Sequence, residues 1–405
     1  MKLDLRDLAW LHSDRLVAYG AITFIALAPA YIFYFHLALV HGSDFYAFWS
    51  AAKLAASGAP HLAYSAQAMS AFQLQHFHSI NLFPKLFFFP FLNPPPFLLI
   101  VMPLAFFQLP YALAIWIGTT FAAWMAAAAK LVRGSRWPLI AFPGAAIAAW
   151  HGQTGLLTGA IMIAAIHNLE RRPALAGILF GLMVVKPQLA MLVPFALIAG
   201  RYYRVLWFAC LSAAGLLNLS WAVFGSTTMI GFLGTTVHAQ QLMHGFDKDA
   251  LARMITVYAS VKLAAGSVPA IAAQLAVTLC MAALVVRIWR GPVGAAAKGA
   301  VLVVANLLAT PYAFAYDLPV LVLPICWIAS EGRRSGFLPW EKLALVAIYW
   351  SPLVCRSIAP ATHFVSMPVL LALTLFLLWR RLNMSEGPKK VRLLPPQTIA
   401  EPRVR

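Results

Sequence analysis

The sequence predicts an all-α, polytopic integral membrane protein. Of its 405 residues, 62% are hydrophobic and only 10% are charged. The mean hydropathy is +0.79, as expected of a membrane protein rather than a soluble domain. Apolar segments recur along the whole chain, and several are long enough to cross a bilayer, which takes about 20 helical residues. We therefore expect a bundle of membrane-spanning helices.

The chain is strongly basic, with 30 Lys and Arg against 12 Asp and Glu and a formal net charge of +18. Such a balance can indicate nucleic-acid binding, but here the basic residues form short clusters between apolar segments. The clusters are Lys130, Arg133 and Arg136; Arg171 and Arg172; Arg201 and Arg204; Arg287 and Arg290; Arg333 and Arg334; and the tail from Arg380 to Arg405. This pattern is typical of cytoplasmic loops. It predicts membrane lipids as partners and no nucleic acid.

The first apolar segment, residues 16–40, follows a polar stretch at residues 1–15. The segment is too long for a signal peptide and lacks a small-residue cleavage site. We therefore expect it to remain as a membrane anchor, with residues 1–15 in the cytoplasm. The four cysteines are isolated within apolar segments, without a C-x-x-C spacing, and are predicted to be packing residues.

Further apolar segments follow, and several are shorter than a full crossing. They lie near residues 94–108, 110–132, 137–151, 153–169, 173–186, 188–200, 204–224, 268–290, 297–310, 313–330, 340–357 and 362–381. If every segment crossed, the clusters at Arg171 and Arg201 would lie outside, against the positive-inside rule. We therefore treat 94–108, which begins with NPPPF, as an incomplete or re-entrant segment. This leaves about 12 to 13 hydrophobic helices in a single transmembrane domain at 16–381, followed by a basic cytoplasmic tail at 382–405.

Two hydrophilic stretches, residues 41–93 and 225–267, fall on the outer side in this topology. The first is expected to form two amphipathic helices on the membrane surface, one after Asp44 and one at about 62–77. Gly58 can end the first of them. This helix would carry an apolar stripe and an opposite polar face. The stripe is Phe45, Phe48, Trp49 and Ala52, and the polar face is Tyr46, Ser50, Lys53 and Ser57.

Asp44 is the first acid after the first apolar segment. Burying a carboxylate at a membrane boundary costs roughly several kcal/mol unless a partner or a function uses it. Its side chain can cap the following helix through the first free N–H groups. It can also accept a proton as a general base. The residues alone leave both roles open, and the two are compatible.

Five motifs occur in order along the chain and together resemble glycosyltransferase family 87. They are SDFYAFWSAAKLAASGAPHLAYS; NPPPFLLIVMPLAFFQLPYALAIW; HGQTGLL; AGILFGLMVVKPQLAMLVPFAL with RYYR; and NLLATPYAFAYDLPVLVLP. The resemblance runs from about residue 40 to residue 330. It implies the type C membrane glycosyltransferase fold and a polyprenyl-phosphate-linked sugar donor. The central stretch TTVHAQQLMHGFDKDALARMITVYAS matches the family only in its placement and its His-bearing amphipathic character.

The resemblance also implies a reaction. A hexose, with mannose the family's best-known sugar, would pass to a lipid or glycan acceptor on the outer, periplasmic face of a bacterial plasma (inner) membrane. Asp44 resembles the family's catalytic base. It would take the proton of the acceptor hydroxyl as that oxygen attacks the anomeric carbon, and the configuration would invert.

No cofactor and no metal are expected. The segment FDKDAL mimics the D-x-D of nucleotide-sugar transferases, whose acids hold a divalent ion on a diphosphate. A lipid monophosphate donor lacks that diphosphate. Asp249 followed by Arg253 is better explained as a helix start with an i, i+4 ion pair.

The departing lipid phosphate requires cations or N–H donors. Lys186, in VVKPQ, follows an apolar run and precedes a proline at the outer end of its segment. It is the strongest candidate for this contact, and the alternative is a lysine that snorkels at a helix end. His151 and Gln153, in WHGQTG, occupy the matching outer turn one hairpin earlier and can bind phosphate or sugar hydroxyls. Gly152 between them allows a close backbone approach or simply a turn.

Three further residues complete the predicted substrate site. His238 and Gln241 can bind donor phosphate or acceptor, or can be polar side chains at the membrane interface. His238 and His244 are six residues apart and do not share a helical face, so we propose no zinc site. Asp317, in TPYAFAYDLP, either lies near the substrate cavity or is a buried acid with a partner.

Two other classes of function stay open on the residues alone. A lipid or sugar transporter, or flippase, would use Asp44, Lys186 and Asp317 as coupling charges near the bilayer midplane. A non-catalytic membrane assembly protein would tolerate replacement of all three. Against the transporter, the sequence shows no internal repeat, and its acids cluster at the outer boundary. Nucleotide sugars are not expected as donors, because the chain shows no soluble inward-facing domain.

Overall fold

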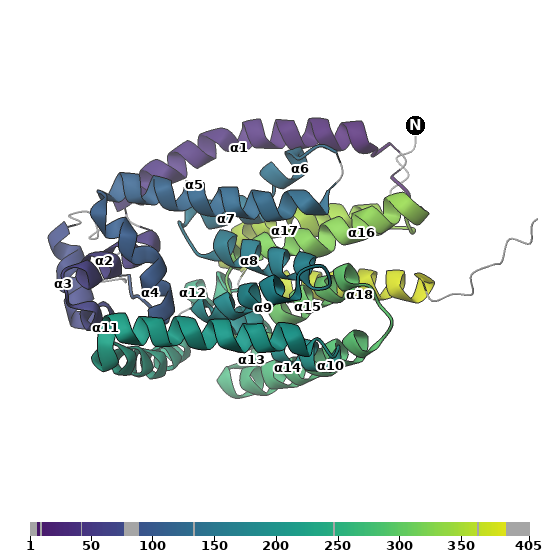
Figure 1. Ribbon diagram of the computed structural model, residues 1–405. Helices are drawn as coiled ribbons and strands as arrows, with labels where there is room; N and C mark the ends of the chain where they lie inside the picture. The colour runs from purple at the N-terminus through teal and green to yellow at the C-terminus, as the bar shows by residue number, and fades with distance from the viewer. Residues whose placement is uncertain are drawn as a thin grey trace, which may run out of the picture.

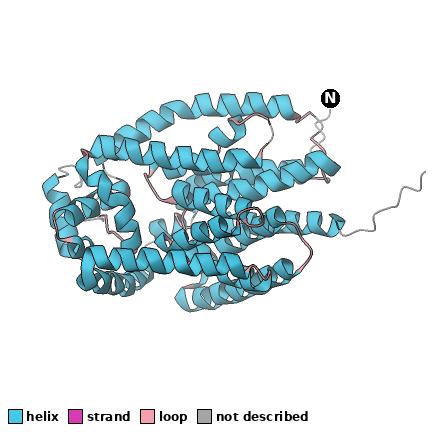
Figure 2. Cartoon of the chain, viewed as in Figure 1, coloured by secondary structure: helices cyan, strands magenta, loops and turns pink. Residues whose placement is uncertain are grey.

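The computed structural model describes residues 6–8, 10–41, 43–76, 89–132, 134–245, 248–362 and 364–385. Helices make up nearly all of this part of the chain (Figure 2). Within these ranges no β-sheet forms, and one isolated antiparallel bridge joins Met254 to Phe314. The prediction of an all-α protein is confirmed.

The α-helices follow one another with short connections, and short 3-10 helices (η) interrupt several of them. The α-helices are α1 (Ser13–His41), α2 (Phe45–Ala56), α3 (Ala66–His76), α4 (Pro95–Val101), α5 (Leu109–Ala128), α6 (Trp137–Ile140), α7 (Pro143–Trp150), α8 (Gly155–Asn168), α9 (Pro173–Leu182), α10 (Val193–Ala199), α11 (Tyr203–Gly245), α12 (Lys248–Ala252), α13 (Val257–Ala265), α14 (Ser267–Arg290), α15 (Ala295–Ala309), α16 (Val322–Ser335), α17 (Glu341–Thr362) and α18 (Met367–Ser385). The 3-10 helices are η1 (Pro60–Tyr64), η3 (Met102–Phe106), η4 (Ala129–Leu131), η5 (Met183–Val185), η6 (Pro187–Ala190) and η7 (Ala315–Leu321).

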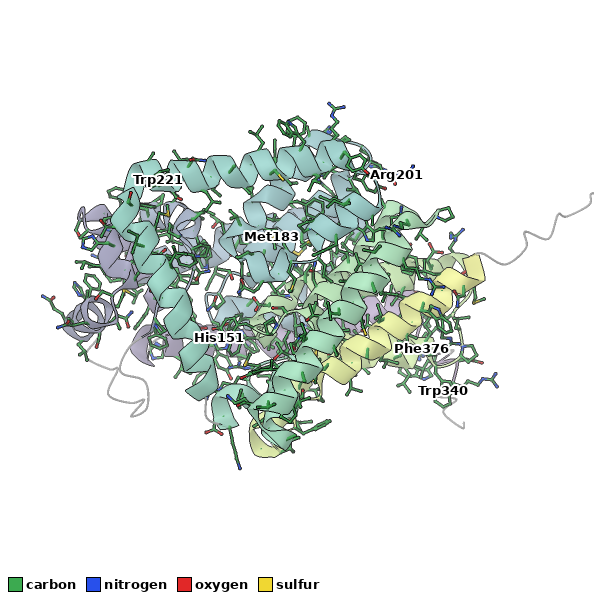
Figure 3. All side chains as sticks on the ribbon, turned by 90° about the horizontal axis from the view of Figure 1, so that it is seen from below. His151, Met183, Arg201, Trp221, Trp340 and Phe376 are labelled. Carbon is green, nitrogen blue, oxygen red and sulfur yellow. The ribbon has the colours of Figure 1, made fainter. Side chains whose placement is uncertain are left out.

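Within the described residues, six helices are long and apolar enough to cross a membrane. Their spans are Val17–Leu37, Leu109–Leu131, Tyr203–Thr235, Ser267–Arg290, Glu341–Ala359 and Met367–Met384. Shorter apolar helices lie at Pro95–Phe106, Gly155–Asn168, Pro173–Val185, Pro187–Ala199 and Ala295–Ala309. Large apolar side chains point outward from the long spans, such as Trp221 and Phe376, which are 53% and 49% exposed (Figure 3). Together these features make the chain a multi-pass membrane protein.

Three of the shorter helices, α7, α8 and α15, form the interior of the bundle, and nearly all of their residues are buried (Figure 1). α7, α8, η7 and α15 pack together in the main apolar core, where Ile147, Leu302 and Leu318 are fully buried. α9 lies along α11, and small residues bring the two backbones together. A Cβ atom at Gly177 would collide with the carbonyl oxygen of Val205. The core of the bundle is therefore built from the short helices α7, α8, η7 and α15.

The helix α2 begins and ends where the sequence predicts, but its polar face is not open. Gly58, with φ of +85°, follows the C-cap residue Ser57. Tyr46 and Ser50, from the expected polar face, are 2% and 0% exposed. The expectation of a surface helix with one solvated face was wrong, because η1, α3, η3 and α4 pack around α2. The aromatic side chains of this region form a second apolar cluster instead.

Residues 94–108 form two short pieces, α4 and η3, which together are too short for a full crossing. This agrees with the incomplete segment that the sequence predicts. α11 continues past the predicted end of its segment at residue 224, through a break at Gly225, where φ is +75°. Most of the stretch 225–267 is therefore helical, in α11, α12 and α13.

The start of α1 and the start of α17 lie close together. The backbone N–H of Trp340, just before α17, donates a 2.7 Å hydrogen bond to the carbonyl oxygen of Arg6. Arg381, near the end of α18, forms an ion pair with Glu341, the first residue of α17. α2 and α3 lie at the opposite end of the bundle (Figure 1). The residues just before α1 and the end of α18 therefore lie at the same end of the bundle.

Candidate active site

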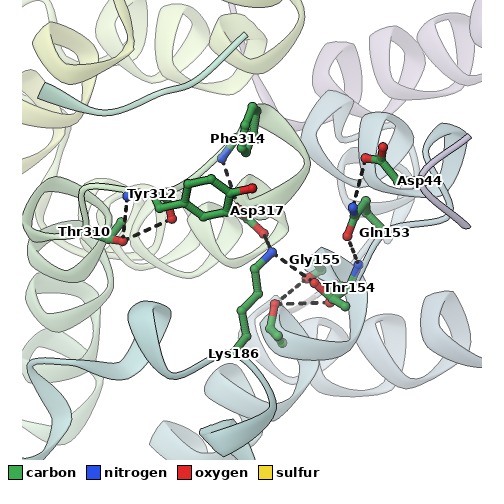
Figure 4. A network of polar contacts seen from close by, with 10 residues as sticks. Asp44, Gln153, Thr154, Gly155, Lys186, Thr310, Tyr312, Phe314 and Asp317 are labelled. Carbon is green, nitrogen blue, oxygen red and sulfur yellow. Dashed lines mark hydrogen bonds and ion pairs between the residues drawn. The ribbon is translucent and has the colours of Figure 1, made fainter. Parts of the chain in front are cut away.

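Asp44 stands between the first span and α2, at the N-cap position of α2. Its side chain makes no capping hydrogen bond. Instead, Oδ2 accepts a hydrogen bond from Nε2 of Gln153, 2.9 Å away (Figure 4). No other hydrogen bond reaches this carboxylate from the described part of the chain. The carboxylate is therefore held through one oxygen, and its other oxygen is available to take a proton.

Gln153 is presented by the turn between α7 and α8. Gly152 in this turn has φ of +58°, and its carbonyl oxygen accepts a 2.9 Å hydrogen bond from Nε1 of Trp116. A Cβ atom at Gly152 would lie 2.8 Å from Cβ of Phe45, the first residue of α2. A glycine is therefore required here both for the backbone conformation of the turn and for the close packing of the turn against α2. Oε1 of Gln153 accepts a hydrogen bond from the backbone N–H of Thr154 (3.2 Å), which leaves the amide N–H directed at Asp44.

Lys186 lies where one short helix ends and the next begins, between η5 and η6. Its side chain is 7% exposed, so it does not snorkel to the membrane surface. Nζ lies 2.5 Å from Oδ1 of Asp317 and 3.1 Å from Oγ1 of Thr154. It also lies 5.1 Å from the centre of the Tyr316 ring. The ammonium group is therefore already paired within the protein.

Asp317 is the buried acid with a partner, which is one of the two alternatives that the sequence leaves open. It is 1% exposed and lies in η7. Its second oxygen, Oδ2, accepts a 3.1 Å hydrogen bond from the backbone N–H of Phe314. Both carboxylate oxygens thus have partners inside the protein. η7 lies directly against α8, because a Cβ atom at Gly155 would collide with the carbonyl oxygen of Tyr316.

Thr154 joins these two groups of residues. Its backbone N–H donates to Gln153, and its hydroxyl accepts from Lys186. A continuous polar chain therefore runs from Asp44 through Gln153, Thr154 and Lys186 to Asp317 (Figure 4). Its members come from five separate places in the fold: the start of α2, the α7–α8 turn, the start of α8, the η5–η6 break and η7. Four of its five members are among the predicted site residues.

Burial raises the pKa of Asp44, because an enclosed carboxylate is less stable in its ionised form. The hydrogen bond from Gln153 and the positive charges of Lys186, Arg356 and Arg253 act in the opposite direction. The net effect is a pKa above the ordinary value of an aspartate. A carboxylate with a raised pKa holds a proton more firmly than a solvated one, which suits a general base.

His151 precedes Gly152 in the same turn. Its ring lies against Tyr316, with 5.9 Å between the ring centres. Burial lowers the pKa of His151 to about 3, and the positive charges of Arg356 and Arg253 add to the effect. The imidazole is therefore neutral near pH 7, with one nitrogen that donates and one that accepts. Such a ring can hydrogen-bond a sugar hydroxyl.

Two arginines near Asp44 were not among the predicted site residues. Arg356 lies in α17, in a segment without any motif, and Arg253 directly follows α12. The predicted ion pair between Asp249 and Arg253 was wrong: it does not form in the described structure, because α12 ends at Ala252 and the helix does not continue through Arg253. A charge within a membrane-spanning segment is itself a sign of function, and this signal would have identified Arg356.

His238 and Gln241 belong to the last turns of α11, but their side chains lie outside the described part of the structure. Their contacts with donor or acceptor stay predictions. Among the described residues, no group of three or more His, Cys, Asp or Glu could hold a metal ion.

Comparison with known families gives a match over much of the chain. The model of glycosyltransferase family 87 matches residues 91–311, which is more than half of the 405-residue chain. The matched region includes His151, Gln153 and Lys186, whereas Asp44 and Asp317 lie outside it. No curated protein and no solved structure matches the chain.

Proposed function

As the chain belongs to glycosyltransferase family 87, and is therefore a membrane glycosyltransferase, we propose that its sugar donor is a polyprenyl-phosphate-linked sugar. The acceptor is a lipid or a glycan, and transfer takes place on the outer, periplasmic face of a bacterial inner membrane. The single observation that carries the proposal is the carboxylate of Asp44, which is held by Gln153 at the end of the polar chain and has one oxygen free of hydrogen bonds from the described residues.

The proposed reaction is a single displacement at the anomeric carbon. The acceptor hydroxyl gives its proton to Asp44 while its oxygen forms a bond to the anomeric carbon. The bond from that carbon to the phosphate oxygen breaks, and its electron pair leaves with the lipid phosphate. Attack occurs on the face opposite the leaving group, so the configuration inverts. No cofactor takes part in this scheme.

The remaining members of the polar chain position Asp44. Gln153 has its amide oxygen tied to the backbone of Thr154, so its amide nitrogen is aimed at the carboxylate. Lys186 fixes the hydroxyl of Thr154, and Asp317 in turn balances the charge of Lys186. A base held in one orientation loses little freedom when the substrate binds, which favours reaction.

The role of Lys186 at the donor phosphate stays a prediction. Two of its three N–H groups have partners, Asp317 and Thr154, and the ring of Tyr316 faces the ammonium group. A lysine whose charge is already balanced attracts a phosphate less strongly than an unpaired cation does. Asp317, which has two internal partners, is better placed to orient Lys186 than to touch substrate.

The family assignment favours transfer over the transporter and assembly alternatives. The experiment that separates the three uses the purified full-length protein in lipid nanodiscs. It is supplied with a radiolabelled polyprenyl-phosphate sugar and total membrane lipid. Label that appears in a new lipid or glycan supports the proposed function. The same protein in sealed vesicles tests the transporter and assembly alternatives. Label that crosses the bilayer without transfer to an acceptor indicates a transporter. Label that neither crosses the bilayer nor reaches an acceptor indicates an assembly protein.

The identity of the sugar rests on the family resemblance, which suggests mannose or another hexose. Hexose epimers differ by the position of one hydroxyl, and enzymes distinguish such substrates through a few hydrogen bonds. His151, with a neutral ring beside the turn that holds Gln153, is one group that can make such a bond. A panel of polyprenyl-linked hexoses, assayed against the same acceptor lipids, would identify the preferred sugar.

A further inference from the structure

Arg253 and Arg356 line the same small pocket, although they lie about 100 residues apart in the sequence. Arg253 follows α12 and is exposed, whereas Arg356 projects from α17 and is partly buried. Apolar residues such as Ala315 and Leu318 of η7 form part of the pocket wall. The pocket therefore opens beside η7, the element that carries Asp317.

Neither guanidinium group has a partner among the described residues. The guanidinium groups of Arg253 and Arg356 donate no hydrogen bond and form no ion pair there, whereas those of Arg381 and Arg334 each bind a glutamate. An unpaired arginine that is partly buried among apolar residues, as Arg356 is, is unfavourable for folding, whereas Arg253 is exposed. The two positive charges also act on one another across the pocket. An arrangement of this kind is stable when an anion lies between the charges.

The charges of both arginines also act on the proposed base. Three positive charges act on the carboxylate of Asp44, those of Lys186, Arg356 and Arg253. Of these, Lys186 already has a carboxylate partner in Asp317. The two arginines are therefore the cations near Asp44 that are free to bind an added anion in the described structure. Guanidinium groups match phosphate oxygens with paired hydrogen bonds, better than a lysine does.

We propose that Arg253 and Arg356 form a lipid-phosphate-binding site beside Asp44, and that its occupant is the phosphate of the sugar donor. This inference rests on the proposed function and names the residues that bind the departing phosphate. As the bond from the anomeric carbon to the phosphate oxygen breaks, the electron pair moves onto the phosphate and adds one negative charge. The two arginines stabilise that charge, while Asp44 receives the acceptor proton. The sugar accordingly lies between Asp44 and the arginine pair.

A phospholipid acceptor would offer similar chemistry, since it also carries a phosphate. The donor phosphate and the acceptor phosphate can be distinguished, because the arginines would affect a different kinetic constant in each case. If the pair binds the donor, Arg356→Gln raises the donor KM and lowers kcat, because the contact strengthens in the transition state. If the pair binds the acceptor, the same substitution raises the acceptor KM and leaves the donor KM unchanged, and the donor assignment is then overturned.

The direct test measures binding rather than turnover. The full-length protein in nanodiscs is titrated with a radiolabelled short-chain polyprenyl phosphate, which is the proposed leaving group, and with the matching polyprenol, which lacks the phosphate. We expect the wild type to prefer the phosphate, and Arg253→Gln and Arg356→Gln each to weaken its binding by about tenfold or more. Polyprenol binding should not change. Equal phosphate preference in wild type and both variants would overturn the proposal.

Two further variants keep the test interpretable. Arg334→Gln serves as the matched control, because Arg334 is exposed and pairs with Glu331 at the far end of α16. Arg356→Lys keeps the positive charge but removes the paired N–H donors of the guanidinium group. This variant should therefore fold and lose part of the preference for phosphate over polyprenol. Because binding of polyprenyl phosphate requires no transfer, this test can succeed even if no sugar is transferred. Failure of the arginine site and failure of the proposed transferase reaction are therefore distinguishable.

Discussion

The amide of Gln153 donates a 2.9 Å hydrogen bond to the carboxylate of Asp44, a residue 109 positions earlier in the chain. This bond links the start of α2 to the α7–α8 turn. It also replaces the helix cap that an aspartate at this position would ordinarily form, since the Asp44 side chain bonds no N–H of α2. The carboxylate is thus oriented by a distant element rather than by its own helix.

Removal of this hydrogen bond should move the pH dependence of transfer. The bond lowers the pKa of Asp44, so Gln153→Ala should raise it further. A general base is active when deprotonated, and the acidic limb of the kcat/KM profile should therefore shift to higher pH. A hydrogen bond to a charged group contributes about 1.5 to 3 kcal/mol, which corresponds to a shift of about one to two pH units.

The measurement is kcat/KM between pH 4 and pH 9 for the wild type and Gln153→Ala, with about 0.3 pH spacing. Gln67→Ala, on the exposed face of α3, is the matched control and should keep the wild-type profile. An acidic limb at the same pH in Gln153→Ala and wild type would mean that Asp44 is not the group that limits the rate at low pH.

The buried pair of Lys186 and Asp317 predicts an asymmetric effect on stability. Lys186→Ala alone leaves a buried carboxylate without its partner and should destabilise the protein by about 3 to 5 kcal/mol. Lys186→Ala combined with Asp317→Ala removes both charges and should recover much of this loss. Thermal unfolding in detergent measures both effects. An exposed pair gives a smaller change, about 0 to 1 kcal/mol, so Arg334→Ala is the control.

The same double variant tests whether Lys186 contacts the donor phosphate. If it does, the double variant should fold and still show a raised donor KM, by about tenfold or more. A donor KM within twofold of wild type in a folded double variant would remove Lys186 from the phosphate site. In that case its role is to hold Thr154 in place.

Much of the fold could be predicted from the sequence because membrane spans depend on local composition. The first span, the incomplete segment at 94–108 and the end of α2 just before Gly58 all follow from hydropathy, proline and glycine. The burial of Tyr46 and Ser50 could not, because it depends on η1, α3 and α4 folding over α2. Contacts between segments that are distant in the sequence cannot be predicted from the spacing of apolar and polar residues within α2.

The candidate site shows the same division. Asp44, Gln153, Lys186 and Asp317 were found because polar residues are conspicuous at the boundary of apolar segments. Their connections were not predictable, since the Lys186–Asp317 pair spans 131 residues and depends on how η7 packs on α8. Arg356 was missed because it lies inside a segment without a motif, and Arg253 because an ion pair within its own helix explained it.

The sidedness of the site can be tested by cysteine labelling in intact cells. The four native cysteines, of which Cys210 and Cys280 are exposed on the spans, are first replaced by serine. Ser57→Cys, next to α2, should then react with an impermeant maleimide from outside, and Ser335→Cys, at the end of α16, should not. Both serines are exposed, so the contrast depends on side rather than burial. The reverse labelling pattern would place the site in the cytoplasm.

Asp44→Asn is the most direct test of the proposed base. The amide preserves the size of the side chain, and its oxygen can still accept the hydrogen bond from Gln153. Because Asp44 makes no capping hydrogen bond, the substitution removes no cap, and the protein should express and fold as the wild type does. An amide cannot take up the acceptor proton, however, and loss of a general base lowers the rate by about 10² to 10⁴.

The expected result is therefore a folded protein that binds polyprenyl phosphate with wild-type affinity and transfers almost no sugar. Asp249→Asn is the matched control, because Asp249 is an exposed acid on α12. Initial rates at saturating donor decide the outcome. If Asp44→Asn keeps more than about a tenth of the wild-type rate, proton transfer to Asp44 does not limit the reaction and the assignment of the base is wrong. Asp317 would be a poor substitute, since both of its oxygens are engaged by Lys186 and by the backbone of Phe314.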